Sequence, residues 1–245
     1  MRLLGVDTSS SHASVAIVEN GRIISEKIHR CEASFSSDRT HGKNSHAETL
    51  LPLIESALGA AAFSLGDISG FAVAIGPGSF TGLRIGLSTV KGLAYGCNVA
   101  AVGISTLHAS AARESDFNGV ICALLDARKR EMYAALFRRR GGSLERLTED
   151  GVMSFGPLID ILHKFGSAQP ILLTGAGVTE YGNLVMECLG SHVRVRPQGS
   201  LPSVAGAVAL LGEARCANGE ASPLASLAPQ YLYSSEPQSR ALKLG

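Results

Sequence analysis

The feature that most constrains the fold is a pattern of short strands and turns that occurs twice along the chain. Residues 3–29 read as three strands, with an aspartate ending the first and the hairpin pair Asn20–Gly21 before the third. Residues 119–149 repeat this order, with Asp126 at the place of Asp7. A unit that occurs twice predicts two related subdomains with a cleft between them.

Helices and strands alternate after each of these units. After the first unit, helical periods occur at residues 46–61 and 81–96, and apolar strands occur at 71–77 and 99–105. Pro52 lies inside the first helical period and predicts a bend or a later helix start, because proline lacks the amide hydrogen. Alternation of this kind predicts parallel strands covered by helices on both faces.

We therefore expect an α/β fold of two tandem β-β-β-α-β-α subdomains, the layout of the actin, sugar-kinase and Hsp70-like ATPases. The predicted N-terminal lobe is 1–110 and the C-terminal lobe is 111–245. The last helix and tail are expected to pack back on the first lobe. Fold alone does not assign a function.

Composition excludes several classes of protein. The net charge of +1 argues against a general nucleic-acid or membrane-surface coat. The five cysteines form no CxxC pair, which argues against a disulfide framework and a zinc knuckle and fits a reduced cytoplasm. No leader or apolar run long enough to span a bilayer is present. We expect a cytoplasmic protein with no membrane partner.

The segment GPGSFTGLRIG, residues 76–86, looks like a phosphate loop but matches no such motif. It lacks the GK[ST] ending of a Walker loop, the GxGxxG spacing of a dinucleotide loop and the GxSxG of a nucleophile elbow. We expect a turn, with Ser79 or Thr81 capping a helix. Two stripes of small residues follow on that helix: one contains Gly82, Gly86, Thr89 and Gly96, and the other contains Ser88, Gly92 and Gly96.

Glycines inside a helix each cost about 0.5 to 1 kcal/mol relative to alanine, so these stripes need a compensating contact. Close packing of another helix, from this chain or from a partner, would supply it. Anion binding at the helix N-terminus is the alternative interpretation.

The residues also carry a family resemblance over essentially the whole chain. It resembles the TsaB family of tRNA threonylcarbamoyladenosine synthesis in the following segments: DTSSSHASVAI, HAETLLPLI, GPGSFTGLRIG with STVKGLA, LDARKREMYAA and PQYL. The segment GPGSFTGLRIG is the most specific of them.

The resemblance implies an actin-like, two-lobed subunit that is not itself the transferase. It implies pairing with a TsaD-type catalytic paralogue, action with a TsaE-type ATPase, a homodimer in isolation, and tRNA only as the substrate of the complex. The reaction would be threonylcarbamoyl transfer to N6 of adenosine 37 in ANN-decoding tRNAs. The resemblance implies that the chain has no cofactor of its own and that ATP is used only at the level of the complex.

The resemblance also implies a pairing surface on two helices of the N-terminal lobe. Its expected residues are His46, Leu50, Leu53, Gly82, Ile85, Gly86, Leu87, Thr89 and Lys91. Gly86→Leu is then expected to abolish pairing. The chain departs from the family at Tyr233, where an arginine is usual, and the polar insertion at 34–43 has no assigned role.

A nucleotide cleft is the main chemical alternative. Acids and hydroxyls at strand ends position magnesium and phosphates in ATPases of this architecture. The candidate residues are Asp7, Thr8, Ser9, Asp126, Gly175 and Gly177. We expect them to form a vestigial cleft. A free-standing ATPase or small-metabolite kinase that uses Asp7 or Asp126 is the alternative function.

Other charged or metal-binding patterns are weaker. His41 and His46 are five residues apart and no HExxH occurs, so no metal site is expected. Arg138–Arg140 reads as a solvated turn, with tRNA phosphates as the alternative contact. Arg128–Arg130 would attract an anion or neutralise neighbouring acids. No tryptophan is available for base stacking.

Overall fold

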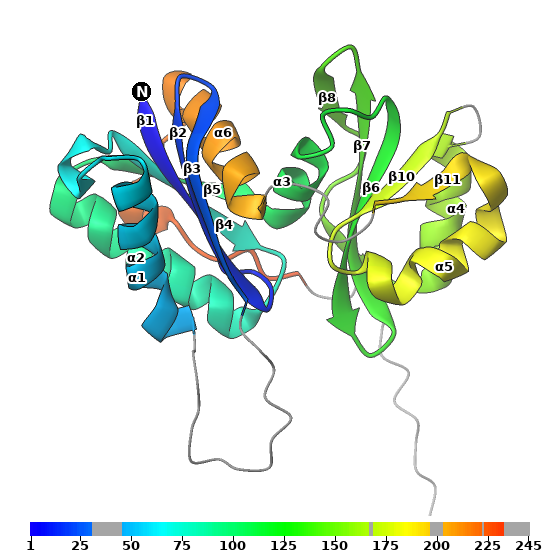
Figure 1. Cartoon of the computed structure of the whole chain (residues 1–245). Coiled ribbons are helices and arrows are strands. Elements are labelled where there is room, and N and C mark those ends of the chain that lie inside the picture. The colour runs from blue at the N-terminus through cyan, green and yellow to red at the C-terminus, as the bar shows by residue number, and fades with distance from the viewer. Residues whose placement is uncertain (31–45, 167–168, 197–202, 222, 233–245) are drawn as a thin grey trace, which may run out of the picture.

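Two sheets with the same strand order form the framework of this computed structural model (Figure 1). The structure describes residues 1–30, 46–166, 169–196, 203–221 and 223–232. The order is β3-β2-β1-β4-β5 in the N-terminal sheet and β8-β7-β6-β10-β11 in the C-terminal sheet, with the short β9 paired to β7. In each sheet the first strand of a unit therefore lies in the middle, flanked by its hairpin partner and by a parallel strand. This arrangement confirms the predicted duplication.

The N-terminal sheet begins with the two predicted hairpins. Asn20 and Gly21 both have positive φ, 51° and 76°, which a type I′ turn requires. Its strands are β1 (Arg2–Asp7), β2 (His12–Glu19), β3 (Arg22–Arg30), β4 (Gly70–Gly76) and β5 (Ala100–Ser105).

The C-terminal sheet is built around a longer hairpin. Leu124 pairs with Ala134 and Asp126 pairs with Met132 across it. The strands of this sheet are β6 (Gly119–Arg128), β7 (Glu131–Arg140), β8 (Ser143–Arg146), β9 (Gly151–Met153), β10 (Ile171–Thr174) and β11 (Val193–Val195).

Helices cover both sheets and leave apolar cores between the layers. One face of the N-terminal sheet carries α1 (His46–Ala60) and α2 (Phe80–Cys97), and one face of the C-terminal sheet carries α4 (Phe155–Gly166) and α5 (Val178–Leu189). Between the lobes lies α3 (Thr106–Ala112), which contacts both sheets. The described residues also contain three short 3₁₀ turns: η1 (Leu65–Asp67), η2 (Gly190–His192) and η3 (Leu224–Ser226).

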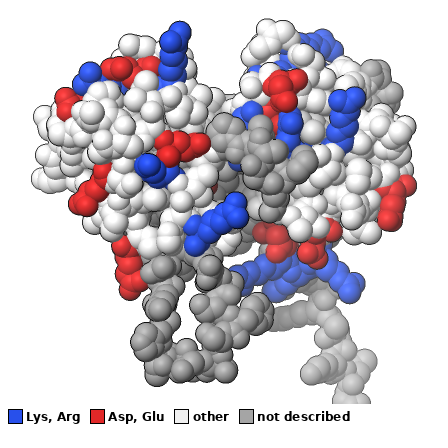
Figure 2. Space-filling view, in the orientation of Figure 1, with Lys and Arg blue, Asp and Glu red and all other residues white. Residues whose placement is uncertain are grey.

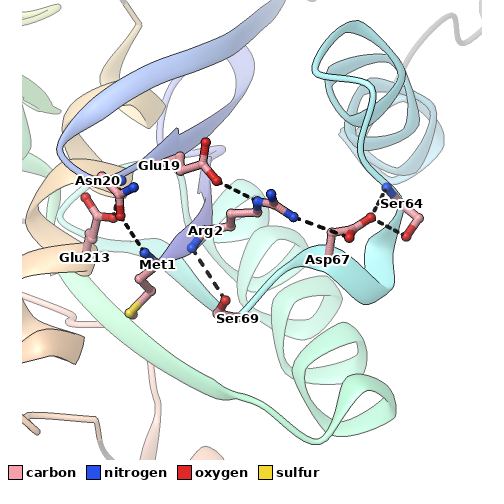
Figure 3. A network of polar contacts seen from close by, with 8 residues as sticks. All are labelled: Met1, Arg2, Glu19, Asn20, Ser64, Asp67, Ser69 and Glu213. Carbon is pink, nitrogen blue, oxygen red and sulfur yellow. Dashed lines mark hydrogen bonds and ion pairs between the residues drawn. The ribbon is translucent and has the colours of Figure 1, made fainter.

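The last helix, α6 (Val204–Ala217), leaves the C-terminal half and packs on the second face of the N-terminal sheet. Glu213 on α6 accepts hydrogen bonds from the backbone amides of Asn20 and Gly21, at 2.9 and 2.7 Å. The Met1 ammonium donates to Asn20 Oδ1, so the N-terminus and α6 both bond to this hairpin (Figure 3). The helix is thereby fixed on the lobe that begins the sequence.

An ion-pair network lies close to this hairpin, at the same end of the N-terminal sheet (Figure 3). Arg2 pairs with Glu19 at 2.7 Å and with Asp67 at 3.3 Å, and its guanidinium stacks over the ring of Phe63. The side chain of Asp67 also accepts from Ser64, which precedes η1. These contacts tie the connection between α1 and β4 to the first strand.

Of the two outcomes predicted for Pro52, a bend or a later helix start, the later start does not occur. The helix α1 begins at His46 and continues through Pro52 to Ala60. The ring of Pro52 is exposed to solvent, and the missing amide removes a single hydrogen bond of the helix. Burial of Leu50, Ile54 and Leu58 on the opposite face holds the helix together across that position.

Candidate functional site

The glycine-rich segment forms a turn and a helix cap, as predicted. Ser79 accepts a hydrogen bond from the Gly82 amide at 3.2 Å and begins α2. The Ser79 amide itself donates to the carbonyl of Ser9 at 2.7 Å. A Cβ at Gly78, whose φ is +157°, would overlap that same carbonyl. Glycine is required here because the turn lies directly on the loop between β1 and β2.

Gly82 and Gly86 of the first stripe of α2 are buried inside the chain. A Cβ at Gly82 would overlap the carbonyl oxygen of Thr8, and one at Gly86 would overlap the Thr8 hydroxyl. That hydroxyl donates to the carbonyl of Gly82 at 2.7 Å. The two glycines therefore admit the end of β1 against the helix. Their predicted place on a partner surface is corrected accordingly.

Leu50 and Leu87 are corrected in the same way. They are 1% and 6% exposed and belong to the core between α1, α2 and the sheet. The five remaining predicted residues are partly exposed: His46, Leu53, Ile85, Thr89 and Lys91. His46 is held at the start of α1 by a 2.9 Å hydrogen bond between Nε2 and the carbonyl of Ser10.

The second stripe of α2 faces solvent. A Cβ at Gly92 or Gly96 would have no neighbour within 4 Å, and Ser88 is exposed. Tyr95 beside them is 83% exposed, and Leu51 on α1 is 49% exposed. The outer face of α1 and α2 thus combines small residues with exposed apolar ones. We call this surface the α1–α2 face.

A shallow groove of about 480 Å³ lies at the start of the α1–α2 face. Its lining comes from the beginnings of both helices: Ala47, Phe80, Thr81, Arg84, Ile85, Ser88 and Thr89. Sequence reasoning did not include most of these residues. The residues from α2 follow the same helical period as the glycine stripe and lie one position further around the helix. That period was the sequence signal from which they could have been identified.

Residues 227–231, near the end of the described chain, are bonded to α2 and to the end of β4. The Gln230 amide donates to the carbonyl of Ile75 at 2.7 Å, and the Lys91 ammonium donates to the carbonyl of Leu227 at 3.2 Å. Lys91, predicted as a partner contact, thus has a partner within the chain. The Tyr231 ring stacks on Phe80, with centroids 5.2 Å apart.

Arg84 completes this aromatic corner of the groove. Its Nε donates to the Tyr231 hydroxyl at 2.8 Å, and its guanidinium carbon lies 3.8 Å from the centroid of Phe80. Tyr233 and the polar insertion at 34–43 lie outside the described residues, as does His41.

The predicted nucleotide residues of the first lobe serve the packing described above. Asp7 is 3% exposed, and burial raises the pKa of its carboxyl, although the hydrogen bond from the Ser9 amide acts in the opposite direction. Thr8 is completely buried, with its hydroxyl committed to Gly82.

The corresponding residues of the second lobe are differently placed. Asp126 is exposed, and its Oδ1 accepts from the Arg128 amide at 2.8 Å. A Cβ at Gly175 would overlap the carbonyl of Leu124, and one at Gly177 would come within 3.0 Å of the backbone there. The glycines after β10 therefore bring that turn against β6.

Metal-ligating side chains are not gathered in the parts of the chain that the structure describes, where no group of three His, Cys, Asp or Glu residues could hold an ion. Within the same parts, none of the helices is both long and apolar enough to cross a membrane.

Comparison with known proteins identifies the family. A sequence model described as TsaD, tRNA N6-adenosine threonylcarbamoyltransferase, matches residues 39–182. The chain is 26% identical over 240 residues to the tRNA threonylcarbamoyladenosine biosynthesis protein TsaB of Bacillus subtilis, covering 98% of this chain and 97% of that protein.

Solved structures support the fold. YeaZ from Pseudomonas aeruginosa superposes with a TM-score of 0.72 at 24% identity, covering 94% of this chain and 99% of that one. The ROK hexokinase from Thermus thermophilus superposes with a TM-score of 0.52 at 11% identity, covering 89% and 100%. The second likeness confirms the predicted sugar-kinase type of architecture. With the duplicated sheets and the match of the family model to more than half of its length, the chain belongs to the TsaD family, and over its full length it is similar to a TsaB protein.

Proposed function

We propose that this chain is the non-catalytic subunit of a tRNA threonylcarbamoyladenosine synthesis complex, and that it pairs with a TsaD-type paralogue through the α1–α2 face. The complex would transfer a threonylcarbamoyl group to N6 of adenosine 37 in ANN-decoding tRNAs. The observation that carries the proposal is the open stripe of Ser88, Gly92 and Gly96, on a helix that also exposes Tyr95.

The chemistry of the α1–α2 face suits a helix from another subunit. Glycines without neighbours allow a second backbone to approach closely, which offsets their cost in helix stability. Tyr95 offers a large, rigid side chain of the kind that contributes most to protein interfaces. Because the paralogue shares this fold, its own corresponding helices are the natural counterpart. The same face would form the homodimer in isolation.

The proposed division of labour leaves the reacting groups to the paralogue. Asp7 and Thr8, which would face magnesium and phosphates in a working ATPase, are buried and bonded within the chain. We propose that the chain has no cofactor of its own, that ATP enters at the level of the complex, and that a TsaE-type ATPase joins that assembly.

A pairing experiment tests the interface. The chain and its TsaD-type paralogue are mixed and co-elution is measured by size, with wild type and with Gly92→Leu. Leucine favours a helix and has room at this position, so the fold should be retained while the partner helix is excluded. We expect loss of co-elution.

The matched control is Gly156→Leu, at an exposed helix glycine of α4 that also has no neighbour within 4 Å. It should leave pairing unchanged. Wild-type pairing by Gly92→Leu would refute this surface as the interface.

The alternative of a free-standing ATPase or kinase is distinguished by titration with Mg-ATP and by turnover. The subunit hypothesis predicts no transfer to tRNA and no ATP hydrolysis by the purified chain alone. Micromolar ATP binding that is lost in Asp7→Ala, together with turnover, would overturn it in favour of the alternative.

A further inference from the structure

The hairpin between β6 and β7 ends in three adjacent basic residues, Arg128, Lys129 and Arg130, which we call the basic tip. All three side chains are exposed. No ion pair involves any of them within the described part of the chain. Figure 2 shows a group of Lys and Arg side chains at the lower end of the C-terminal lobe, where this hairpin ends in Figure 1.

The backbone of the basic tip is unusual for the residues that it contains. Arg128, Lys129 and Arg130 have φ of 66°, 51° and 65°, in the left-handed region that disfavours long side chains. Elsewhere the chain fills tight hairpins with suitable residues, Asn20–Gly21 and Gly141–Gly142. A turn selected for stability alone would contain glycine or asparagine here as well. The three basic residues are therefore explained by what their side chains contact and not by the turn.

Acidic groups lie at the base of the tip and do not neutralise its end. Asp126 turns back to the Arg128 amide. Asp126 and Glu180 add to the effect of burial in raising the pKa of Tyr181, whose hydroxyl donates to the Glu131 carbonyl. These carboxylates therefore gather around the start of α5, and red side chains lie just above the blue group in Figure 2. An anion that approaches the end of the hairpin meets the cations first.

The shape of the tip favours an extended polyanion over an enclosed small molecule. The three exposed residues follow one another at the end of a hairpin that extends from the lobe (Figure 1), so they can each reach a different phosphate of one backbone. Tyr133, the first aromatic residue beyond the turn, lies in β7, so the three residues of the turn itself offer no ring on which a base could stack. Contacts of this type contribute affinity and position without sequence specificity.

We propose that the basic tip binds the phosphodiester backbone of the tRNA on which the complex acts. This rests on the proposed function for the identity of the RNA, but the contact itself belongs to the C-terminal lobe and not to the α1–α2 face. The subunit would then position the substrate as well as support its paralogue.

The test measures binding of an unmodified tRNA transcript at several salt concentrations, for the chain alone and for its complex with the paralogue. The tip is neutralised as Arg128→Asn with Lys129→Asn and Arg130→Asn, because asparagine tolerates the left-handed backbone and preserves the turn. We expect affinity to fall about tenfold at 0.1 M salt, and the slope of log K against log salt to shrink by about 2 to 3 units, in line with three lost phosphate contacts.

The matched control removes three exposed charges elsewhere, as Arg22→Gln with Lys164→Gln and Arg194→Gln, which gives the same net charge. It should retain wild-type affinity and slope. Equal losses in the two triple variants, or no loss in the tip variant, would overturn the proposal.

Two further arms separate the source of the phosphate and the partner. Competition by ATP at equal phosphate concentration should be far weaker than competition by RNA, and equal competition would overturn the assignment to an extended backbone. Co-elution of the tip variant with the paralogue should be unchanged, whereas loss of co-elution with tRNA binding retained would show the tip to be a protein contact. A failed pairing experiment at Gly92 with a positive result here would refute the interface and leave the RNA contact standing.

Discussion

Gly86 packs directly against Thr8, so that the middle of α2 touches the end of β1 with no side chain between them. The Thr8 hydroxyl lies in this contact and donates to Gly82, one turn earlier on the helix. Gly82 and Gly86 are therefore needed for the fold of the chain itself. Gly86→Leu, expected from the sequence to test pairing, would instead test stability.

We predict that Gly86→Ala destabilises the chain, because a methyl group there must displace the Thr8 hydroxyl. Overpacking of this kind costs about 1 to 3 kcal/mol. For a chain of this size each kcal/mol corresponds to a fall in Tm of about 2 to 4 °C. Thermal unfolding followed by circular dichroism measures the effect.

Gly96→Ala, in the same helix, has the opposite expectation. Its Cβ would meet nothing within 4 Å, so the gain in helix propensity of about 0.5 to 1 kcal/mol should raise Tm slightly. Equal shifts in the two variants would contradict the division of α2 into an inner and an outer stripe.

A buried ion pair joins the linker after α3 to the C-terminal sheet. Glu114 is fully buried and accepts from Arg196 Nε at 2.6 Å and from the Thr174 hydroxyl at 2.5 Å. Glu114→Gln should destabilise the chain by about 1.5 to 3 kcal/mol, because it removes the buried charge that bonds Arg196 and Thr174, while Arg196 keeps its pair with Asp116. Urea unfolding gives this free energy.

Asp116 provides an internal comparison, since it bonds the same arginine at 2.7 Å but is 65% exposed in its side chain. Asp116→Asn should cost at most about 1 kcal/mol. A larger cost for Asp116→Asn than for Glu114→Gln would show that burial does not decide the strength of these pairs.

The buried carboxyl of Asp7 predicts a pH dependence. Burial raises its pKa above the ordinary value of 3.8, and the charges of Arg113 and His46 act against this. The folded state then binds more protons than the unfolded state above that value, so its contribution to stability falls as pH rises from about 4. Asp7→Asn keeps the acceptor for the Ser9 amide and should remove this loss.

The measurement is the free energy of unfolding of wild type and Asp7→Asn between pH 4 and 7. Their difference should grow in favour of the variant as pH rises, while the exposed Asp160→Asn should show no such trend. A difference that is constant with pH would refute a raised pKa at Asp7.

His108 predicts the opposite dependence. Burial lowers its pKa below 6.5, helped by the positive charge of Arg146, and its ring stacks on Phe137 at 5.4 Å. The unfolded state therefore binds the proton first, and stability is lost as pH falls below about 6.5. His108→Gln should reduce this loss between pH 7 and 5 in urea unfolding, and the exposed His192→Gln should not. An unchanged pH profile in His108→Gln would contradict the expectation.

Much of the fold follows from local signals in the sequence. Asp7 at the end of β1, Asn20–Gly21 and the cap at Ser79 each depend on neighbours within a few residues, and each is found where it was predicted. Asp126 differs, because β6 continues past it to Arg128. The duplication is visible because it is a matter of order along the chain. The outcome at Pro52 differs because the burial of a helix face, which stabilises α1 as a whole, is a tertiary contribution.

The site required the tertiary structure. A glycine carries no side chain whose polarity could indicate its surroundings, so the two stripes of α2 look equivalent in the sequence. The approach of Thr8, from a strand distant along the chain, buries Gly82 and Gly86 and leaves Ser88, Gly92 and Gly96 outside. The sequence determined that α2 would be closely packed on its small residues, and only the assembled lobe decided which of them remain open to a partner.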